Sequence, residues 1–268
     1  MSRIAVGCWL AACAFFCSAT TGFAQSNSPY MSSIPVQRAS TEQAVSNEHA
    51  QMTLHVSRPE LSVAALSDID GVTIIHADQS TISIALAHAA TIAGQPQEKY
   101  RQSTFVVDYD EPPVQSIAEN LRSVLEQKPT QDDLQKYVYD HIADKTYSRT
   151  FDYASRVAES GAGDCTEHAV LLAALARASG YYARVVIGTL LLDTESEPRA
   201  FGHAWTEIHD GSDWRIRDAT LPMEDSAVRN ITYLPLGILD DEGPGYSISL
   251  IRSVSMMPSR ISGLAIPD

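Results

Sequence analysis

Three residues of this sequence have side chains whose types and order suit covalent chemistry: Cys165, His203 and Asp218. A cysteine thiolate is a strong nucleophile, an imidazole can take up a proton and pass it to a leaving group, and a carboxylate can hold that imidazole in one tautomer. Three such groups together can cleave or transfer an acyl group. They can do so only where the surrounding elements bring them to one place.

Cys165 lies at the predicted start of a buried helix. The residues from Gly161 to Ala169 read Gly-Ala-Gly-Asp-Cys-Thr-Glu-His-Ala and lead into an apolar stretch from Val170 to Ala178. A helix that is apolar on nearly every face is a central one. Asp164 suits the N-cap, and Glu167 completes a capping box. The sulfur at the first helical position would meet backbone N–H groups and the positive end of the helix dipole, so we expect these to favour the thiolate and the charge of Asp164 to oppose it.

His203 and Asp218 lie on a predicted β-hairpin. Its parts are an alternating strand from Phe201 to His209, a turn from Asp210 to Asp213 and a returning strand from Trp214 to Asp218. If His209 pairs with Trp214, then His203 and Asp218 are diagonal neighbours on one face, with β-carbons about 7–8 Å apart. Taken singly, His203 could be a sheet histidine with local hydrogen bonds and Asp218 a turn residue. The two beside an unpaired cysteine favour a catalytic interpretation.

The first 24 residues have the pattern of a secretory signal peptide. Arg3 precedes an apolar run from Ile4 to Phe16, and Gly22-Phe23-Ala24 provides small residues for cleavage after Ala24. The alternative is a lipoprotein signal at Leu10–Cys13. No later segment approaches the ~20 apolar residues of a membrane-spanning helix, so we expect an exported, soluble mature chain. Cleavage after Ala24 would leave Cys165 as the single cysteine, either as a reactive thiol or as a small buried hydrophobe.

Three regions are predicted for the mature chain. Residues 25–60 are polar and weakly periodic, and we expect a mobile lead-in. Residues 61–112 form a β-rich region, closed by Pro112-Pro113, with strands expected at Val72–His76, Ser80–Leu86 and Thr104–Asp110. Residues 113–268 form the core domain, which begins with helices expected at Val114–Glu126 and from Thr130 to about Asp144.

Three sequence blocks resemble the transglutaminase-like superfamily, in its exported bacterial branch. They are Gly163–Ala169, Gly202–Glu207 and Trp214–Thr220, and they occur in the order that the family shows. The resemblance implies an α+β fold with a papain-like core, in which the cysteine-bearing helix packs on an antiparallel sheet. It also implies a catalytic triad at Cys165, His203 and Asp218, the residues reached above from their positions.

The expected function is that of an exported, periplasmic thiol enzyme. Such an enzyme would act on peptide or amide bonds of a substrate in the cell envelope through a thioester, by hydrolysis rather than crosslinking. No cofactor or metal is required. A formal net charge of -14 on 268 residues opposes binding to nucleic acid or anionic lipid.

Two other functions stay open from the sequence. Cys165, His168 and His203 could hold a zinc ion, although no further ligand at suitable spacing supports this. The fold could also serve as a non-catalytic binding module of the cell envelope. Among the remaining residues, His141, His168 and His209 are expected to be structural or exposed, and Trp205 and Trp214 to pack across strands or line the cleft.

Overall fold

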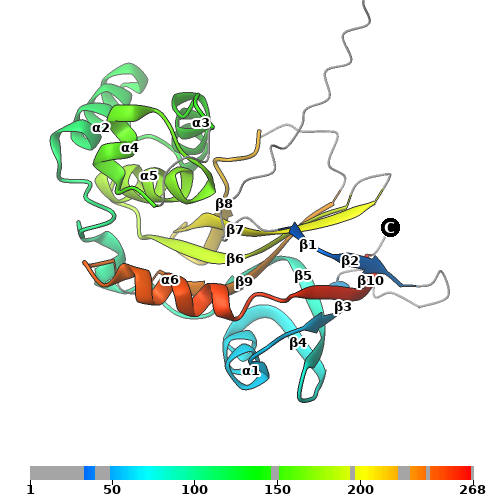
Figure 1. Ribbon diagram of the computed structural model, residues 1–268. Coiled ribbons are helices and arrows are strands. Elements are labelled where there is room, and N and C mark those ends of the chain that lie inside the picture. The colour runs from blue at the N-terminus through cyan, green and yellow to red at the C-terminus, as the bar shows by residue number, and fades with distance from the viewer. Residues whose placement is uncertain are drawn as a thin grey trace, which may run out of the picture.

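The computed structural model describes residues 33–39, 49–145, 151–193, 197–222, 230–239 and 242–266. These residues form two five-stranded sheets, with a layer of helices above one of them (Figure 1). The proposed leader, residues 1–24, lies outside the described residues.

The first sheet, sheet A, carries the predicted hairpin. Its order is β1-β7-β6-β9, with β8 paired to β7 off this path, and its pairs are antiparallel. The strands are β1 (Ser33–Ile34), β6 (Ala183–Asp193), β7 (Pro198–His209), β8 (Trp214–Arg217) and β9 (Asn230–Ile238). Residues His209 and Trp214 pair directly, which confirms the predicted register.

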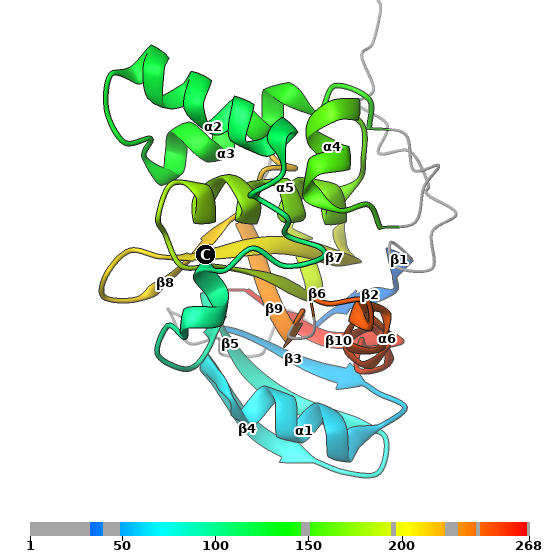
Figure 2. The ribbon, with the colours of Figure 1, turned by 90° about the vertical axis from the view of Figure 1, so that its left-hand side faces the viewer.

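Helices cover one face of sheet A (Figure 2). They are α2 (Pro112–Leu125), α3 (Gln131–His141), α4 (Ala154–Ser160) and α5 (Cys165–Ala178). The apolar helix α5 is central, as its sequence predicts, and its buried residues share a core with Ile187 of β6 and with Ala204 and Ile208 of β7. The Thr206 hydroxyl donates to the Ala169 carbonyl at 2.8 Å, and this bond fixes the position of α5 along β7.

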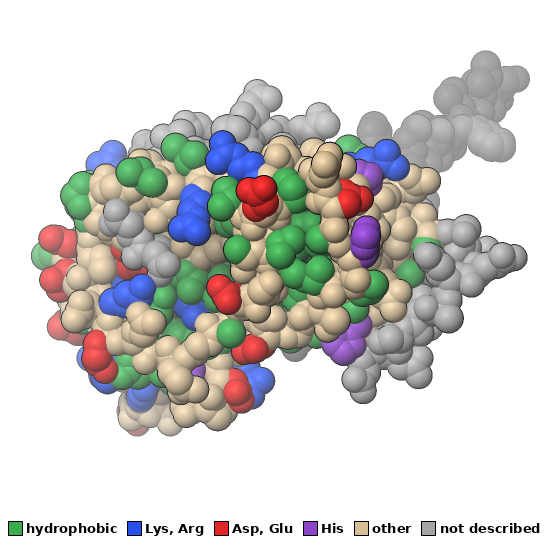
Figure 3. Space-filling view, turned by 90° about the horizontal axis from the view of Figure 1, so that it is seen from below, with side chains coloured by type: hydrophobic (Ala, Val, Ile, Leu, Met, Phe, Trp, Pro, Cys, Tyr) green, Lys and Arg blue, Asp and Glu red, His purple; other side chains and the backbone are tan. Residues whose placement is uncertain are grey.

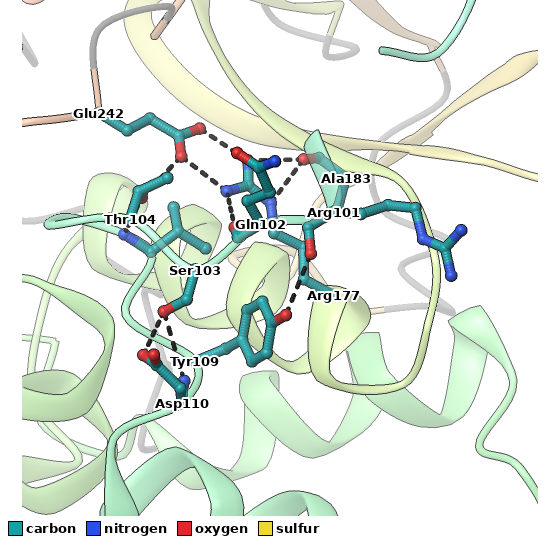
Figure 4. A network of polar contacts seen from close by, with 10 residues as sticks. Arg101, Gln102, Ser103, Thr104, Tyr109, Asp110, Arg177, Ala183 and Glu242 are labelled. Carbon is teal, nitrogen blue, oxygen red and sulfur yellow. Dashed lines mark hydrogen bonds and ion pairs between the residues drawn. The ribbon is translucent and has the colours of Figure 1, made fainter. Parts of the chain in front are cut away.

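A buried ion pair anchors the other end of α5 (Figure 4). Arg177 donates from both terminal nitrogens to the two carboxylate oxygens of Glu242, each at 2.7 Å. The same guanidinium also donates to the carbonyls of Gln102 and Ala183. Bidentate geometry makes such a pair directional, so it holds α5, the start of β6 and residues 102–104 together.

The second sheet, sheet B, has the order β2-β10-β3-β5-β4. Its strands are β2 (Val36–Arg38), β3 (His49–His55), β4 (Ile69–Ala77), β5 (Thr81–Ile92) and β10 (Arg260–Ala265), and the elements outside the sheets are α1 (Pro59–Ser67), the short 3-10 helix η2 (Glu98–Arg101) and α6 (Tyr246–Ser255). Ile82 and Leu86 of β5 share a core with Leu191 and Leu234 of sheet A, so the two sheets pack against each other.

The face below sheet B carries exposed apolar side chains. Figure 3 shows this face from below, and hydrophobic side chains gather near its centre among charged groups. Leu61 on α1 and Ile75 on β4 are among the large hydrophobic residues that stay exposed. The strongly apolar packing of the molecule lies instead between the sheets and beneath α5.

The region boundaries differ from the sequence-based expectation at both ends. Residues 25–60, expected as a mobile lead-in, contain β1, β2 and β3, and β3 buries Ala50, Met52 and Leu54 at alternate positions. At the other end, β10 pairs with β2 and β3, so the last strand belongs to the N-terminal sheet and not to the core region of residues 113–268.

The predicted elements between these ends are mostly confirmed, with one error. The strands at Val72–His76 and Ser80–Leu86 and both helices lie within β4, β5, α2 and α3 or overlap them closely. Thr104–Asp110 is a loop and not a strand, because its side chains bond to segments outside the sheets: Thr104 donates to Glu242, and Asp108 accepts from Ser155 in the first turn of α4. Pro112 starts α2, where a missing N–H removes no helical hydrogen bond.

Candidate active site

The start of α5 has the predicted capping box. The Asp164 side chain accepts from the Thr166 N–H at 2.8 Å, and the Glu167 side chain accepts from the Asp164 N–H at 2.8 Å. A Cβ at Gly163 would collide with the Cβ and Cγ of Glu167, so glycine is required there by space. The cap places Cys165 at the first helical position, as expected.

The sulfur of Cys165 is buried against β7. Its side chain belongs to the core and the residue is 3% exposed. The backbone N–H of Ala204, the residue after His203, hydrogen-bonds to the sulfur. This contact brings the helix start to the strand that carries the histidine.

The thiol is nevertheless not poised as a thiolate, and the expectation of a lowered pKa is wrong. Burial raises the pKa of Cys165 well above its usual range, and the charge of Asp164 raises it further, while the Ala204 N–H lowers it. Desolvation of the charged form therefore outweighs the helix start. A thiolate at this position requires a base that takes the proton directly.

His203 and Asp218 form a hydrogen bond, which their diagonal placement on the hairpin allows. Nε2 of His203 lies 2.8 Å from Oδ2 of Asp218. Because a carboxylate only accepts, Nε2 carries the proton and Nδ1 keeps its lone pair when the ring is neutral. Both residues are 5% exposed. The imidazole therefore has one nitrogen held by Asp218 and the other able to act as a base.

The carboxylate of Asp218 is held on both oxygens. Besides His203, Oδ2 accepts from the Tyr233 hydroxyl at 2.9 Å, and Oδ1 accepts from the backbone N–H and the hydroxyl of Thr220. Burial alone would raise the pKa of Asp218, but the charge and hydrogen bond of His203 and the bonds from Thr220 lower it to about 2. Asp218 is thus ionised whenever the imidazole becomes charged.

Sequence analysis missed Tyr233 and gave Thr220 no separate role. Thr220 lies two residues after Asp218, a spacing at which hydroxyls commonly bond to an aspartate, so a local signal was present. Tyr233 lies on β9, which pairs with β6 and not with the hairpin, so only the sheet order brings it to Asp218. Nothing in its local sequence indicates the contact.

A second buried carboxylate, Glu167, lies two residues after the cysteine. It accepts hydrogen bonds from the N–H groups of Asp152 and Asp164, at 2.9 and 2.8 Å. Burial raises the pKa of Glu167, and the charge of Asp164 raises it further, to about 7. The helix start therefore carries a glutamate that titrates near neutral pH.

His168 is buried and is held by the same turn. Its Nδ1 lies 2.6 Å from the Asp164 carbonyl, and the residue is 2% exposed. Burial lowers the pKa of His168 to about 4, so the ring is neutral at pH 7. Across the part of the chain that the structure describes, no three His, Cys, Asp or Glu side chains are grouped to hold a metal, so Cys165, His168 and His203 form no such site.

The two hairpin tryptophans are packing residues. Trp205 is 1% exposed and its ring lies 5.1 Å from the ring of Tyr233, edge to face. Trp214 donates to the Gly94 carbonyl at 2.8 Å and lies 3.8 Å beneath the guanidinium of Arg184. Trp205 and Trp214 therefore pack inside the molecule, and neither lines the cavity beside Asp218.

A cavity of about 380 Å³ lies beside Asp218. Its walls come from α3, the hairpin and the residues after it, β9 and β5, and they are mainly apolar: Ala89, Gln135, Ile216, Asp218, Leu221, Pro222, Ile231 and Tyr233. Cys165 and His203 are not among these residues. Cys165 is buried, while Asp218 borders this open space.

Sequence comparison finds a family match in the central part of the chain. Residues 115–219 match the family model described as the transglutaminase-like superfamily. The matched segment extends from α2 to the residue after Asp218 and contains Cys165 and His203. No curated protein matches the sequence.

Structural comparison found solved structures of low sequence identity. The "Putative Cysteine Protease" of Cytophaga hutchinsonii is 14% identical, with a TM-score of 0.46 over 70% of this chain and 79% of that one. The periplasmic domain of TgpA from Pseudomonas aeruginosa is 14% identical, with a TM-score of 0.41 over 72% and 82% of the two chains. In the described segments of the present chain, no helix is both long and apolar enough to cross a membrane.

Proposed function

We propose, from the match of residues 115–219 to the transglutaminase-like superfamily, that this chain is an exported cysteine-dependent hydrolase of peptide or amide bonds. Cys165 is the nucleophile, His203 the general base and then acid, and Asp218 the group that orients the imidazole. The proposed substrate is a peptide or protein of the cell envelope, and the proposed compartment is the periplasm.

One observation carries the proposal more than any other. The imidazole bonded to Asp218 belongs to His203, and the next residue along β7, Ala204, donates its N–H to the Cys165 sulfur. Adjacent residues of one strand therefore contact the proposed orienting carboxylate and the proposed nucleophile. A histidine and an aspartate that served only the sheet would have no need of a cysteine at this point.

The proposed reaction begins with proton transfer. The thiol proton of Cys165 moves to Nδ1 of His203, and the thiolate attacks the substrate carbonyl carbon. The oxyanion that forms lies at the positive end of the α5 dipole, which stabilises negative charge. The imidazolium then protonates the departing amine, the C–N bond breaks, and a thioester remains on the sulfur.

Asp218 supports both proton transfers. With a pKa of about 2 it is an anion throughout, and it lies against the ring when the ring is positive. The hydrogen bond between His203 and Asp218 matters because the pKa of Cys165 is raised. A buried thiol ionises only as its proton moves to a neighbouring base. Charge separation in a dry site needs a fixed counter-ion nearby.

Water is the proposed acceptor of the acyl group. We favour hydrolysis over crosslinking, because the sequence offers no separate site for a second amine substrate. The apolar cavity beside Asp218 suits an uncharged substrate side chain, since its walls include Ile216, Leu221 and Ile231. Export is supported by the leader pattern of residues 1–24.

The test compares wild-type protein with Cys165→Ala. Both are incubated with a peptide and amide library and with an electrophilic probe for cysteine hydrolases, and products and adducts are identified by mass spectrometry. We expect cleavage products and a probe adduct only with wild type, at equal thermal stability of the two proteins. Products that also form with Cys165→Ala would exclude the proposed nucleophile.

A second candidate function is a non-catalytic binding module of the cell envelope. It is favoured by the burial of Cys165, which is 3% exposed and has a raised thiol pKa. The two functions separate in a deletion strain of the source organism. Full rescue of the deletion phenotype by Cys165→Ala would support the binding module, and failure of that variant would support the enzyme.

A further inference from the structure

His168 presents a buried nitrogen that the proposed reaction has not yet used. Among the described residues its Nε2 has no hydrogen-bond partner, although the residue is 2% exposed. A buried polar atom left without a partner destabilises the folded protein. A role in binding or catalysis is one of the few explanations for a buried nitrogen without a hydrogen-bond partner.

The tautomer of His168 is fixed by its other nitrogen. Nδ1 lies 2.6 Å from the Asp164 carbonyl, which can only accept, so Nδ1 carries the proton and Nε2 is an acceptor. The Asp164 carbonyl also accepts from the His168 backbone N–H at 3.1 Å, so its pairing does not depend on the ring. The Asp164 carbonyl would have a partner without the ring, so the main effect of the side-chain bond is to orient the imidazole.

The ring of His168 lies beside the first turn of α5. A bond from Nδ1 to the residue four positions earlier turns the side chain back toward the helix start, where Cys165 lies three residues away on a neighbouring position of the helix surface. The charges of Lys145, Asp218 and Asp164 all act on this ring. His168 is thus near enough to the cysteine turn and to Asp218 for the charges of both to act on its ring.

We propose that Nε2 of His168 accepts a hydrogen bond from the water molecule that hydrolyses the thioester, and so positions that water for attack. This inference rests on the proposed function. After the amine has left, the attacking water needs two acceptors for its two hydrogens if a lone pair is to face the carbonyl carbon. His203 Nδ1 supplies one acceptor and His168 Nε2 the other.

The step balances as follows. The water oxygen bonds to the thioester carbon while one of its protons moves to His203 Nδ1, and its second O–H keeps its hydrogen bond to His168. The tetrahedral intermediate then collapses, the C–S bond breaks, and the proton on His203 returns to the sulfur. The product is a carboxylic acid, and both imidazoles end in their starting states.

His168 suits an acceptor that must not become a second base. Its pKa of about 4 keeps the ring neutral at pH 7, so it does not compete with His203 for the proton of the water.

The test separates acylation from deacylation. His168→Phe keeps a planar ring but removes the acceptor, and His168→Gln keeps an acceptor oxygen. His209→Gln is the matched control, because His209 is also buried but lies at the far end of β7. Each protein is mixed rapidly with an activated ester or amide substrate, and the acyl-enzyme is followed by intact-mass spectrometry.

We expect His168→Phe to acylate within about threefold of wild type but to deacylate about 10- to 100-fold more slowly, so that acyl-enzyme accumulates. His168→Gln should be intermediate, and His209→Gln should match wild type. Added hydroxylamine, which attacks without the water, should restore turnover of His168→Phe.

Two results would overturn the inference: unchanged deacylation in His168→Phe, or acylation and deacylation slowed equally, as a structural role would give. If His168→Phe does not fold, His168→Leu is measured in its place. Wild-type protein that never acylates would contradict the proposed function itself, which is a different outcome from normal acylation with an unaffected variant.

Discussion

The Asp218 carboxylate reaches Nε2 of His203 at 2.8 Å although the two residues are only diagonal neighbours on the hairpin. Strand β8 ends at Arg217, so Asp218 already leaves the ladder and can turn toward the histidine. Thr220 holds one carboxylate oxygen and Tyr233 the other, which fixes the direction of that turn. The pair is therefore set by three elements: β7, the segment after β8, and β9.

Asp218→Asn should lower kcat/KM about a thousandfold. The N–H and hydroxyl of Thr220 both donate to Oδ1, so they keep the amide oxygen on their side and the N–H2 faces His203. The N–H2 cannot accept the Nε2 proton, so the ring is driven to the tautomer in which Nδ1 cannot act as a base. The measurement is cleavage of a substrate found with the library described above, together with a thermal melt. Near-normal kcat/KM in a folded Asp218→Asn protein would show that the carboxylate does not orient the base.

Tyr233→Phe should have a smaller effect on kcat/KM than Asp218→Asn. It removes one of the hydrogen bonds to Asp218 and leaves His203 and Thr220 in place. We expect kcat/KM to fall about 3- to 10-fold, because the carboxylate keeps its main partner and loses some of its fixed position. A loss as large as that of Asp218→Asn would assign Tyr233 a direct part in the reaction.

Arg177→Met should destabilise the protein by about 3–5 kcal/mol, because it leaves the Glu242 carboxylate buried without its cation. The two side chains are 0% and 6% exposed and share two hydrogen bonds (Figure 4). Urea unfolding of Arg177→Met, Glu242→Gln and the double variant gives the coupling energy of the pair. The double variant should lose less than the two single losses together.

The exposed pair of Lys136 and Asp140 provides the control for that experiment. Its nitrogen–oxygen distance is the same 2.7 Å, but its side chains are 69% and 57% exposed. Lys136→Met should change the free energy of unfolding far less than Arg177→Met, because water screens the pair. Equal losses from Arg177→Met and Lys136→Met would contradict the importance given to burial.

Native Cys165 should react with iodoacetamide more slowly than free cysteine at pH 7. Burial restricts access to the sulfur and raises its pKa, so little reactive thiolate is present. In urea the rate should rise to that of an ordinary thiol. Labelling is followed by mass spectrometry from pH 6 to 10, and fast labelling of the folded protein with a step below pH ~8.5 would contradict the described environment.

The sequence predicts well those parts of the site that depend on local rules. The capping box at Asp164 and Glu167 follows from a three-residue spacing, and the shared face of His203 and Asp218 follows from strand alternation across a four-residue turn. Both rest on geometry within one element or one hairpin. The catalytic roles of these residues remain a proposal.

The properties that the sequence misjudges depend on distant segments. The thiol pKa of Cys165 is raised because α5 is packed into the core, and the first turn of a helix does not reveal how deeply it is buried. The contact of Tyr233 with Asp218 requires β9 to lie beside β6. Strand β3 is an exception, because Ala50, Met52 and Leu54 alternate with polar residues and this is the local pattern of a half-buried strand. Its partners β5 and β10 follow it by about 30 and 200 residues.

Glu167 and His168 should give opposite dependences of stability on pH. The pKa of Glu167 is raised from 4.5 to about 7, so its contribution is fully present below pH 4.5 and is lost as pH rises through 7. The pKa of His168 is lowered from 6.5 to about 4, so stability falls as pH decreases from 6.5 to 4, where the unfolded chain binds a proton that the folded one does not. Each effect spans about 3 kcal/mol, and in wild type the two largely cancel.

Single substitutions should expose each dependence. Relative to wild type, Glu167→Gln should become more stable as pH rises from 4.5 to 7, and His168→Phe should become more stable as pH falls from 6.5 to 4. The measurement is urea unfolding at half-unit pH steps, with Glu119→Gln on the exposed side of α2 as the control for loss of a carboxylate. Difference curves for Glu167→Gln and His168→Phe that slope in the same direction would show that burial does not move these two groups as described, and would remove the basis for a neutral His168 beside the cysteine.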